Sequence, residues 1–129
     1  MNGRDRVLLL DDRADGERVQ GLGDTLLVNA QPRPTLRVGV GSMERWHLWN
    51  VAQHRVFTLA LPGHVLVVDG EPTAELSLAP GQHASLEVTF AHPAGSVVDL
   101  TTLDGEPGPD VVEAWPMLRV VYVKKEPQP

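Results

Sequence analysis

The sequence contains no cysteine in its 129 residues. This absence excludes disulfide bonds, thiolate zinc sites, iron–sulfur clusters, a cysteine nucleophile and a blue-copper centre within this chain. It does not fix a cellular compartment, because a chain without cysteine is compatible with both oxidising and reducing surroundings. The absence therefore restricts the chemistry of the chain and not its location.

A basic surface and a long apolar run are also lacking. The formal net charge is −6 and the only adjacent basic residues are Lys124 and Lys125, so the composition argues against a nucleic-acid partner. No apolar run approaches the ~18 residues that a membrane-spanning helix needs. The apolar run at 7–10 ends at two aspartates, which leaves it too short for a signal peptide. We therefore expect no membrane span and no export signal in this segment.

Helical periodicity is nearly absent, and the 11 prolines and 12 glycines separate short apolar runs. Turn residues at intervals of about 8–12 positions are typical of an antiparallel β-sandwich or barrel. We predict an all-β fold with a single domain at 1–123 and a linker or tail at 124–129. The expected strands are 7–10, 25–28, 35–40, 45–51, 56–61, 65–68, 75–78, 83–90, 97–100 and 117–123.

Alternation within the expected strand at 45–51 assigns its side chains to two faces. Trp46, Leu48 and Asn50 share one face, which we expect to point into the core. His47 and Trp49 fall on the opposite face, which we expect to be exposed.

Histidines are the first candidates for a metal site. The chain has five of them, and none forms the His-x-His pair of a strand or the His-x₃-His pair of a helix. We therefore predict isolated turn or surface histidines, with a site assembled from distant histidines as the alternative. The five are His47, His54, His64, His83 and His92.

Carboxylates and serines give no clearer indication of catalysis. The candidate carboxylates lie in loops rich in glycine and proline, where such groups usually solvate turns. No serine has a Gly-x-Ser-x-Gly setting, and Gly39-x-Gly41 is too short for a dinucleotide-binding motif. We predict no catalytic, cofactor-binding or metal-ligating residue. The carboxylates considered are Asp11, Asp12, Asp99, Asp104, Glu106 and Asp110.

Two groups of apolar residues are candidates for contact with another molecule or domain. Trp49 lies on the polar face of its strand, and Trp115, Pro116 and Met117 form an apolar cluster near the C-terminus. Such residues suit an interface, and exposed tryptophans also suit a sugar-binding surface. Trp49, Trp115 and Met117 are the predicted contact residues.

The order of short motifs along residues 23–70 is more specific than any single motif. The stretch reads GDTLLVNAQPRPTLRVGVGSMERWHLWNVAQHRVFTLALPGHVLVVDG. It resembles the central cupredoxin domain of three-domain multicopper oxidases, the laccase-like proteins. The matching motifs are Gly23-Asp24-Thr25, Val28-Asn29, Pro34-Thr35-Leu36-x-Val38, Arg45 with Leu48 to Asn50, Phe57-x-Leu59, Gly63-His64, Asp69-Gly70 and Leu78-Ala79-Pro80-Gly81-Gln82, and the resemblance extends to VLLLDDRADG upstream and the strand at 118–123.

The sequence departs from the family pattern at a few positions. Ala30 follows Asn29 where the family usually has glycine, which puts the form of that turn in question. His47 and Trp49 replace a typical arginine and leucine. None of these changes creates a metal site.

The resemblance implies a Greek-key sandwich or barrel of the cupredoxin type. In the family, copper ligands occur in the first and third domains as His-x-His and His-Cys-His motifs, and neither motif occurs here. The resemblance thus implies a copper-free domain that bridges two flanking copper-bearing cupredoxin domains and helps to shape the substrate pocket. The parent would be a periplasmic or extracellular oxidase that couples one-electron oxidation of a substrate to reduction of oxygen, and this segment would be an excised part of it.

Two other interpretations stay open. Some relatives of this architecture have lost all copper and act as structural proteins in the cell envelope. The chain is alternatively a stand-alone ligand- or sugar-binding β-sandwich that uses Trp49 or Trp115.

Overall fold

The computed structural model describes residues 4–13, 25–104 and 113–124. In these ranges the chain forms strands and turns, and no helix with the length and apolar character of a membrane span. The strands are β1 (Arg4–Arg13), β2 (Thr25–Val28), β3 (Gln31–Pro32), β4 (Thr35–Gly39), β5 (Met43–Asn50), β6 (Phe57–Ala60), β7 (Leu66–Val68), β8 (Glu71–Thr73), β9 (Leu76–Leu78), β10 (His83–Thr89), β11 (Val97–Asp104) and β12 (Glu113–Val123).

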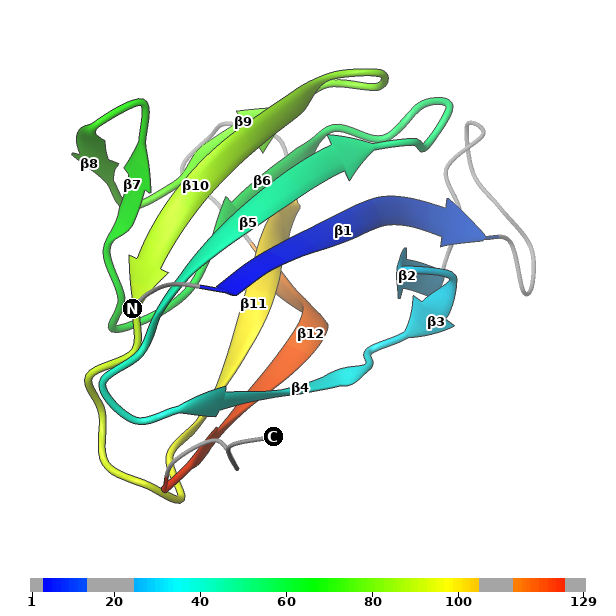
Figure 1. Cartoon of the computed structure of the whole chain (residues 1–129). Helices are drawn as coiled ribbons and strands as arrows, with labels where there is room; N and C mark the ends of the chain where they lie inside the picture. Colours follow the sequence, from blue (N-terminus) through cyan, green and yellow to red (C-terminus); the bar gives the residue numbers. More distant parts are fainter. Residues whose placement is uncertain (1–3, 14–24, 105–112, 125–129) are drawn as a thin grey trace.

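The strands form two sheets that pack face to face. One has the order β3-β2-β1-β5-β10-β7-β8 and the other the order β4-β12-β11-β6-β9. In Figure 1 the layer of β1, β5 and β10 runs diagonally above β4, β11 and β12. The predicted all-β sandwich is confirmed.

The sheets are mixed, which corrects the expectation of purely antiparallel pairing. β1 pairs in parallel with β5, and β4 pairs in parallel with β12. The chain leaves the first sheet after β3, contributes β4 to the second sheet and returns at β5. This long excursion lets β5 lie beside β1 in the same direction, as parallel neighbours require.

The predicted strands lie close to the observed ones, with two additions. The expected strand at 25–28 coincides with β2, and the run at 7–10 is the middle of the longer β1. The additions are β3 and β8, which contain Pro32 and Pro72 and pair along one edge only. Proline is tolerated at such edges because its missing N–H faces away from the ladder. β1 extends beyond the expected strand end at Leu10 to Arg13, and residues 14–24 lie outside the described residues.

The core fills the space between the sheets. Along β5 burial alternates residue by residue, and Trp46, Leu48 and Asn50 are all fully buried, as the alternation predicted. Phe57, Leu59 and Leu100 of the opposite sheet belong to the same core cluster as Trp46 and Leu48.

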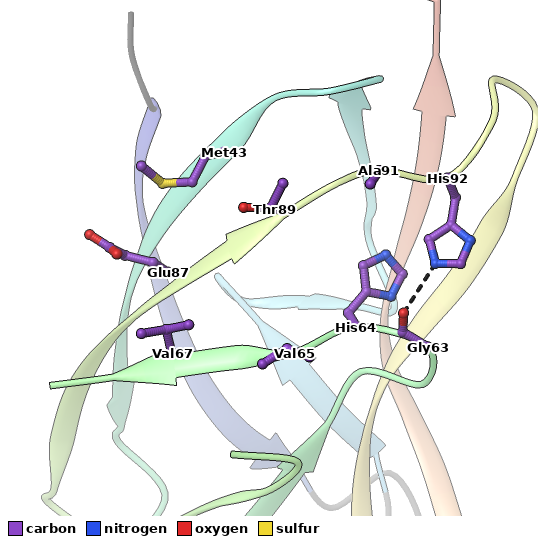
Figure 2. Close-up of a pocket in the computed structure, with 9 residues that line it drawn as sticks. All are labelled: Met43, Gly63, His64, Val65, Val67, Glu87, Thr89, Ala91 and His92. Atoms are coloured by element: carbon purple, nitrogen blue, oxygen red, sulfur yellow. Dashed lines mark hydrogen bonds between the residues drawn. The ribbon is translucent and has the colours of Figure 1, made fainter. Parts of the chain in front are cut away.

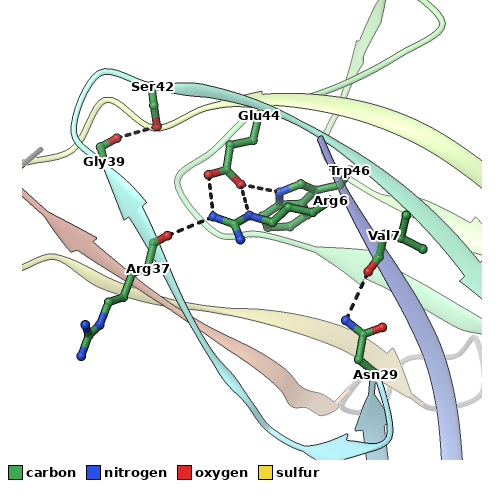
Figure 3. Close-up of polar contacts among 8 residues, drawn as sticks. All are labelled: Arg6, Val7, Asn29, Arg37, Gly39, Ser42, Glu44 and Trp46. Carbon is green, nitrogen blue, oxygen red and sulfur yellow. Dashed lines mark hydrogen bonds and ion pairs between the residues drawn. The ribbon is translucent and has the colours of Figure 1, made fainter. Parts of the chain in front are cut away.

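The turn between β2 and β3 keeps the form of a two-residue hairpin despite Ala30. Asn29 and Ala30 have φ values of 52° and 67°, and Val28 pairs directly with Gln31. Positive φ at both central residues is the geometry that two-residue hairpins prefer. The side chain of Asn29 also reaches β1, where its Nδ2 donates to the Val7 carbonyl at 3.2 Å (Figure 3).

An irregularity in β12 determines where the C-terminal apolar cluster lies. Leu118 pairs with Leu100 but Pro116 pairs with Thr101, so Met117 is an extra residue on β12. A bulge of this kind re-aims side chains, and both Met117 and Leu118 are buried. Met117 therefore belongs to the core and not to the exposed surface, whereas Trp115 is 46% exposed.

Candidate functional site

Two of the five histidines lie together at one end of the sandwich. His64 follows β6 and its turn, His92 follows β10, and their ring centroids are 4.7 Å apart. Figure 2 shows both rings beside Gly63, whose carbonyl accepts a hydrogen bond from Nε2 of His92 at 3.1 Å. The sequence contains the Gly63-His64 pair in its family pattern, but nothing local places His92 beside it.

Tyr122 completes this cluster from β12, and sequence reasoning did not single it out. Nδ1 of His64 lies 2.9 Å from the carbonyl oxygen of Pro62, which only accepts, so Nδ1 donates. Nε2 of His64 therefore carries the free lone pair and accepts the hydroxyl of Tyr122. One neutral tautomer of His64 satisfies both hydrogen bonds.

The surroundings favour the neutral forms of the His64 imidazole and the Tyr122 phenol. Burial lowers the pKa of His64 below its ordinary value, and the neighbouring His92 lowers it further, against a raising effect of the Pro62 carbonyl. Burial also raises the pKa of Tyr122, against a lowering effect of the His92 backbone N–H. The pair is thus a neutral phenol that donates to a neutral imidazole.

A cleft of about 330 Å³ opens beside His64 and His92, between β7 and β10. Its walls are largely apolar, with Met43, Val65 and Val67 among them, and Glu87 and Thr89 add polar atoms (Figure 2). Glu87 is ion-paired with Arg45 at 2.8 Å.

The other histidines are dispersed over the surface. His47 bonds Ser85 on the outer face of the seven-stranded sheet, and His83 stacks on Trp49 with ring centroids 4.2 Å apart. His54 is exposed in the loop after β5. Within the described ranges, no three groups of the types that bind metals come together. Nδ1 and Nε2 of His64, moreover, are both engaged in hydrogen bonds.

The candidate carboxylates that the structure describes form ion pairs or hydrogen bonds within the fold. Asp12 forms a buried ion pair with Arg55 at 3.1 Å, and Asp99 pairs with Arg33 at 2.8 Å. The carboxylate of Asp11 accepts the backbone N–H of Asp12. Glu106, Asp110 and the side chain of Asp104 lie outside the described residues.

A buried charge that the sequence did not reveal lies on β5, next to Met43 of the cleft. Glu44 is 1% exposed, and its carboxylate accepts two hydrogen bonds from Arg6 and one from Nε1 of Trp46 (Figure 3). Arg6 also donates to the carbonyl of Arg37 on β4, which links the two sheets. This cluster is fully paired, so we interpret it as structural.

Trp49 and Trp115 are exposed, on different sheets. Trp49 is 42% exposed on β5, and Leu9, its register partner on β1, is exposed beside it. Trp115 is on β12 of the five-stranded sheet. Whether either tryptophan contacts another domain stays a prediction.

Comparison with known proteins indicates a family. The sequence profile described as Multicopper oxidase matches residues 4–97. Among solved structures, a bacterial laccase-like multi-copper oxidase from Ochrobactrum sp. has a TM-score of 0.75 and 28% identity, over 97% of this chain and 33% of that one. A search of curated proteins finds no match.

Two further solved structures share the fold at lower identity. A variant of a multicopper oxidase from Aquifex aeolicus has a TM-score of 0.76 and 22% identity, over 95% of this chain and 32% of that one. A multi-copper oxidase from Pseudomonas thermotolerans has a TM-score of 0.74 and 24% identity, over 99% of this chain and 34% of that one. The chain thus spans about a third of the length of each of the three structures.

Proposed function

Because this chain belongs to the multicopper oxidase family, we propose that it is the central cupredoxin-like domain of a three-domain member and holds no copper itself. In this role it bridges two copper-bearing domains and helps to shape the surroundings of the substrate pocket. The whole protein, in the periplasm or outside the cell, oxidises its substrate with reduction of O₂.

The donor set of the chain is the observation that carries this proposal. Copper sites of this family need a cysteine and closely spaced histidines, whereas this sequence has no cysteine and no His-x-His pair. The two histidines that do meet, His64 and His92, are engaged with Tyr122 and with backbone carbonyls. These residues do not fit a copper centre, so we derive no step through copper in this chain.

The distribution of exposed apolar side chains supports a position between two neighbours. One patch, on the outer face of the seven-stranded sheet, contains Leu9 and Trp49 with Val7 and Val51 beside them. Trp115 lies apart from it, on the five-stranded sheet. Exposed apolar surface of this kind marks interfaces, and a central domain needs two of them.

Copper titration tests the proposal directly. We expect Cu(II) added to the 129-residue chain to give only the EPR spectrum of weakly bound or aqueous copper, without a stoichiometric type-1 or type-2 signal. A tightly bound stoichiometric signal contradicts the copper-free role.

The gene that encodes the chain tests the rest of the proposal. We expect it to encode a His-Cys-His motif downstream of this segment and His-x-His pairs on both sides of it. A gene with flanking cupredoxin domains but without these motifs contradicts the oxidase and indicates a copper-less relative.

A further inference from the structure

The hydrogen bond between Tyr122 and His64 has the arrangement that proton transfer requires. The hydroxyl of Tyr122 donates to Nε2 of His64, and the Pro62 carbonyl holds the other imidazole hydrogen on Nδ1. The lone pair on Nε2 thus points at the phenolic hydrogen in the only tautomer that satisfies both contacts.

The burial of Tyr122 leaves His64 as its base. The tyrosine is 2% exposed, so bulk water has little access to its hydroxyl. A phenol that loses one electron becomes strongly acidic, and its proton must go to a base within hydrogen-bond reach. His64 is only half-buried and lines the cleft of Figure 2, where the imidazolium formed by proton uptake is hydrated.

We propose that Tyr122 and His64 form a proton-coupled redox site. An outer-sphere one-electron oxidant takes one electron from Tyr122, its O–H bond breaks, and the proton moves to Nε2 of His64. The products are a neutral phenoxyl radical and an imidazolium, and return of one electron moves the proton back to Tyr122. This activity goes beyond the proposed function and does not depend on it.

The neighbours of the pair suit this reaction. Burial keeps the pKa of Tyr122 high and that of His64 low, so at neutral pH Tyr122 holds its proton and Nε2 of His64 is unprotonated. Phe90 and His92 each meet the Tyr122 ring edge-on at 5.7 Å and shield the radical. The remaining charged group of the cleft, Glu87, is ion-paired with Arg45.

The composition makes the experiment specific, because Tyr122 is the only tyrosine in the chain. Photogenerated ruthenium(III) tris-bipyridine serves as the oxidant, and freeze-quench EPR detects the radical. Ring-deuterated tyrosine narrows the spectrum only if the radical is on Tyr122, which separates it from radicals on the three tryptophans. We expect a phenoxyl signal in the native chain at neutral pH and none in Tyr122→Phe.

The variant His64→Gln separates proton acceptance from a merely structural hydrogen bond. Glutamine offers the hydroxyl an acceptor oxygen but has no basic nitrogen. We expect the phenoxyl yield to fall by at least about tenfold in this variant, in keeping with the size of general-base effects, while circular dichroism shows an unchanged fold. We also expect the phenoxyl yield of the native chain to decrease when the pH is well below ~6.5, because His64 is then protonated.

Several outcomes overturn the proposal. These are a native chain that forms tryptophan radicals only, an equal phenoxyl yield in His64→Gln, and a native yield that does not change with acidification. Hydrogen–deuterium exchange of the segment around 62–65 confirms that the variant keeps the local structure.

Discussion

The carboxylate of Glu44 lies 2.7 Å from Nε of Arg6 across the parallel pair of β5 and β1, in a site that water barely reaches. Glu44 is 1% exposed and also accepts the indole N–H of Trp46. Arg6 extends from the same ion pair to a carbonyl of β4 in the other sheet. One ion pair thus connects β1, β5 and the edge of the second sheet.

Removal of Arg6 is expected to be strongly destabilising. In Arg6→Leu the carboxylate of Glu44 stays buried without its cation, and breaking a buried pair in this way costs about 3–5 kcal/mol. Urea denaturation followed by circular dichroism measures the change. The exposed pair of Arg45 and Glu87, 2.8 Å apart, provides the control. We expect Arg45→Leu to leave the unfolding midpoint unchanged, and equal effects of the two substitutions contradict the role of burial.

Asn50 is a second buried polar residue with a measurable role. Its Nδ2 donates to the carbonyls of Arg55 and Leu78, and its Oδ1 accepts the N–H of Ala52. Asn50→Leu removes these three hydrogen bonds, and each buried group left unsatisfied costs about 1–3 kcal/mol. We expect the urea midpoint to fall and the exchange of the Ala52 amide to accelerate. An unchanged midpoint contradicts the prediction.

The two-residue hairpins offer a matched pair of glycine substitutions. Ala30 has φ 67° in the turn after β2, and Gly70 has φ 80° in the turn after β7. An alanine with positive φ is strained by about 1–2 kcal/mol. A glycine relieves this strain, but part of the gain is offset because glycine has more conformational freedom in the unfolded chain. We expect Ala30→Gly to stabilise the chain and Gly70→Ala to destabilise it, each by about 1 kcal/mol. Thermal unfolding measures both, and shifts of the same sign contradict the argument.

The sequence predicted best what adjacent residues determine. Alternation along 45–51 placed Trp46 and Asn50 in the core and Trp49 on the surface, because side chains of a strand alternate between faces. Turn residues such as Asp69-Gly70 marked the ends of strands for a similarly local reason. The turn requires positive φ, which is 53° at Asp69 and 80° at Gly70.

What depends on distant pairing could not be predicted. Parallel alignment of β1 with β5 follows from the excursion of the chain through the second sheet, and no periodicity records it. Met117 points inward because of a bulge against β11, which a simple alternation does not foresee. His64 and Tyr122 are 58 residues apart in sequence, so only the folded chain reveals that they form a pair.

The pH dependence of stability provides the last prediction, because His64 and Tyr122 act on opposite sides of neutrality. The folded pKa of His64 lies below its ordinary value, so below pH ~6.5 the unfolded chain binds more protons at this residue. Its contribution to stability is therefore present above pH ~6.5 and is lost as the pH falls towards the folded pKa. The folded pKa of Tyr122 lies above its ordinary value. Its contribution is present below pH ~10 and is lost as the pH rises through the folded pKa.

Urea midpoints over a pH series, compared between variants, isolate these two contributions from those of the other titrating groups. We expect the midpoint of the native chain to exceed that of His64→Gln at pH 8, and the difference to shrink in acid because glutamine does not titrate. The difference between the native chain and Tyr122→Phe is expected to shrink in strong alkali for the corresponding reason. His92→Gln removes a neighbour that lowers the pKa of His64. The pKa of His64 then lies closer to its ordinary value, so we expect the contribution of His64 to stability to change less with acidification in this variant than in the native chain. Parallel curves for the native chain and His64→Gln across the acid range contradict the assignment of His64 as a neutral, hydrogen-bonded partner of Tyr122.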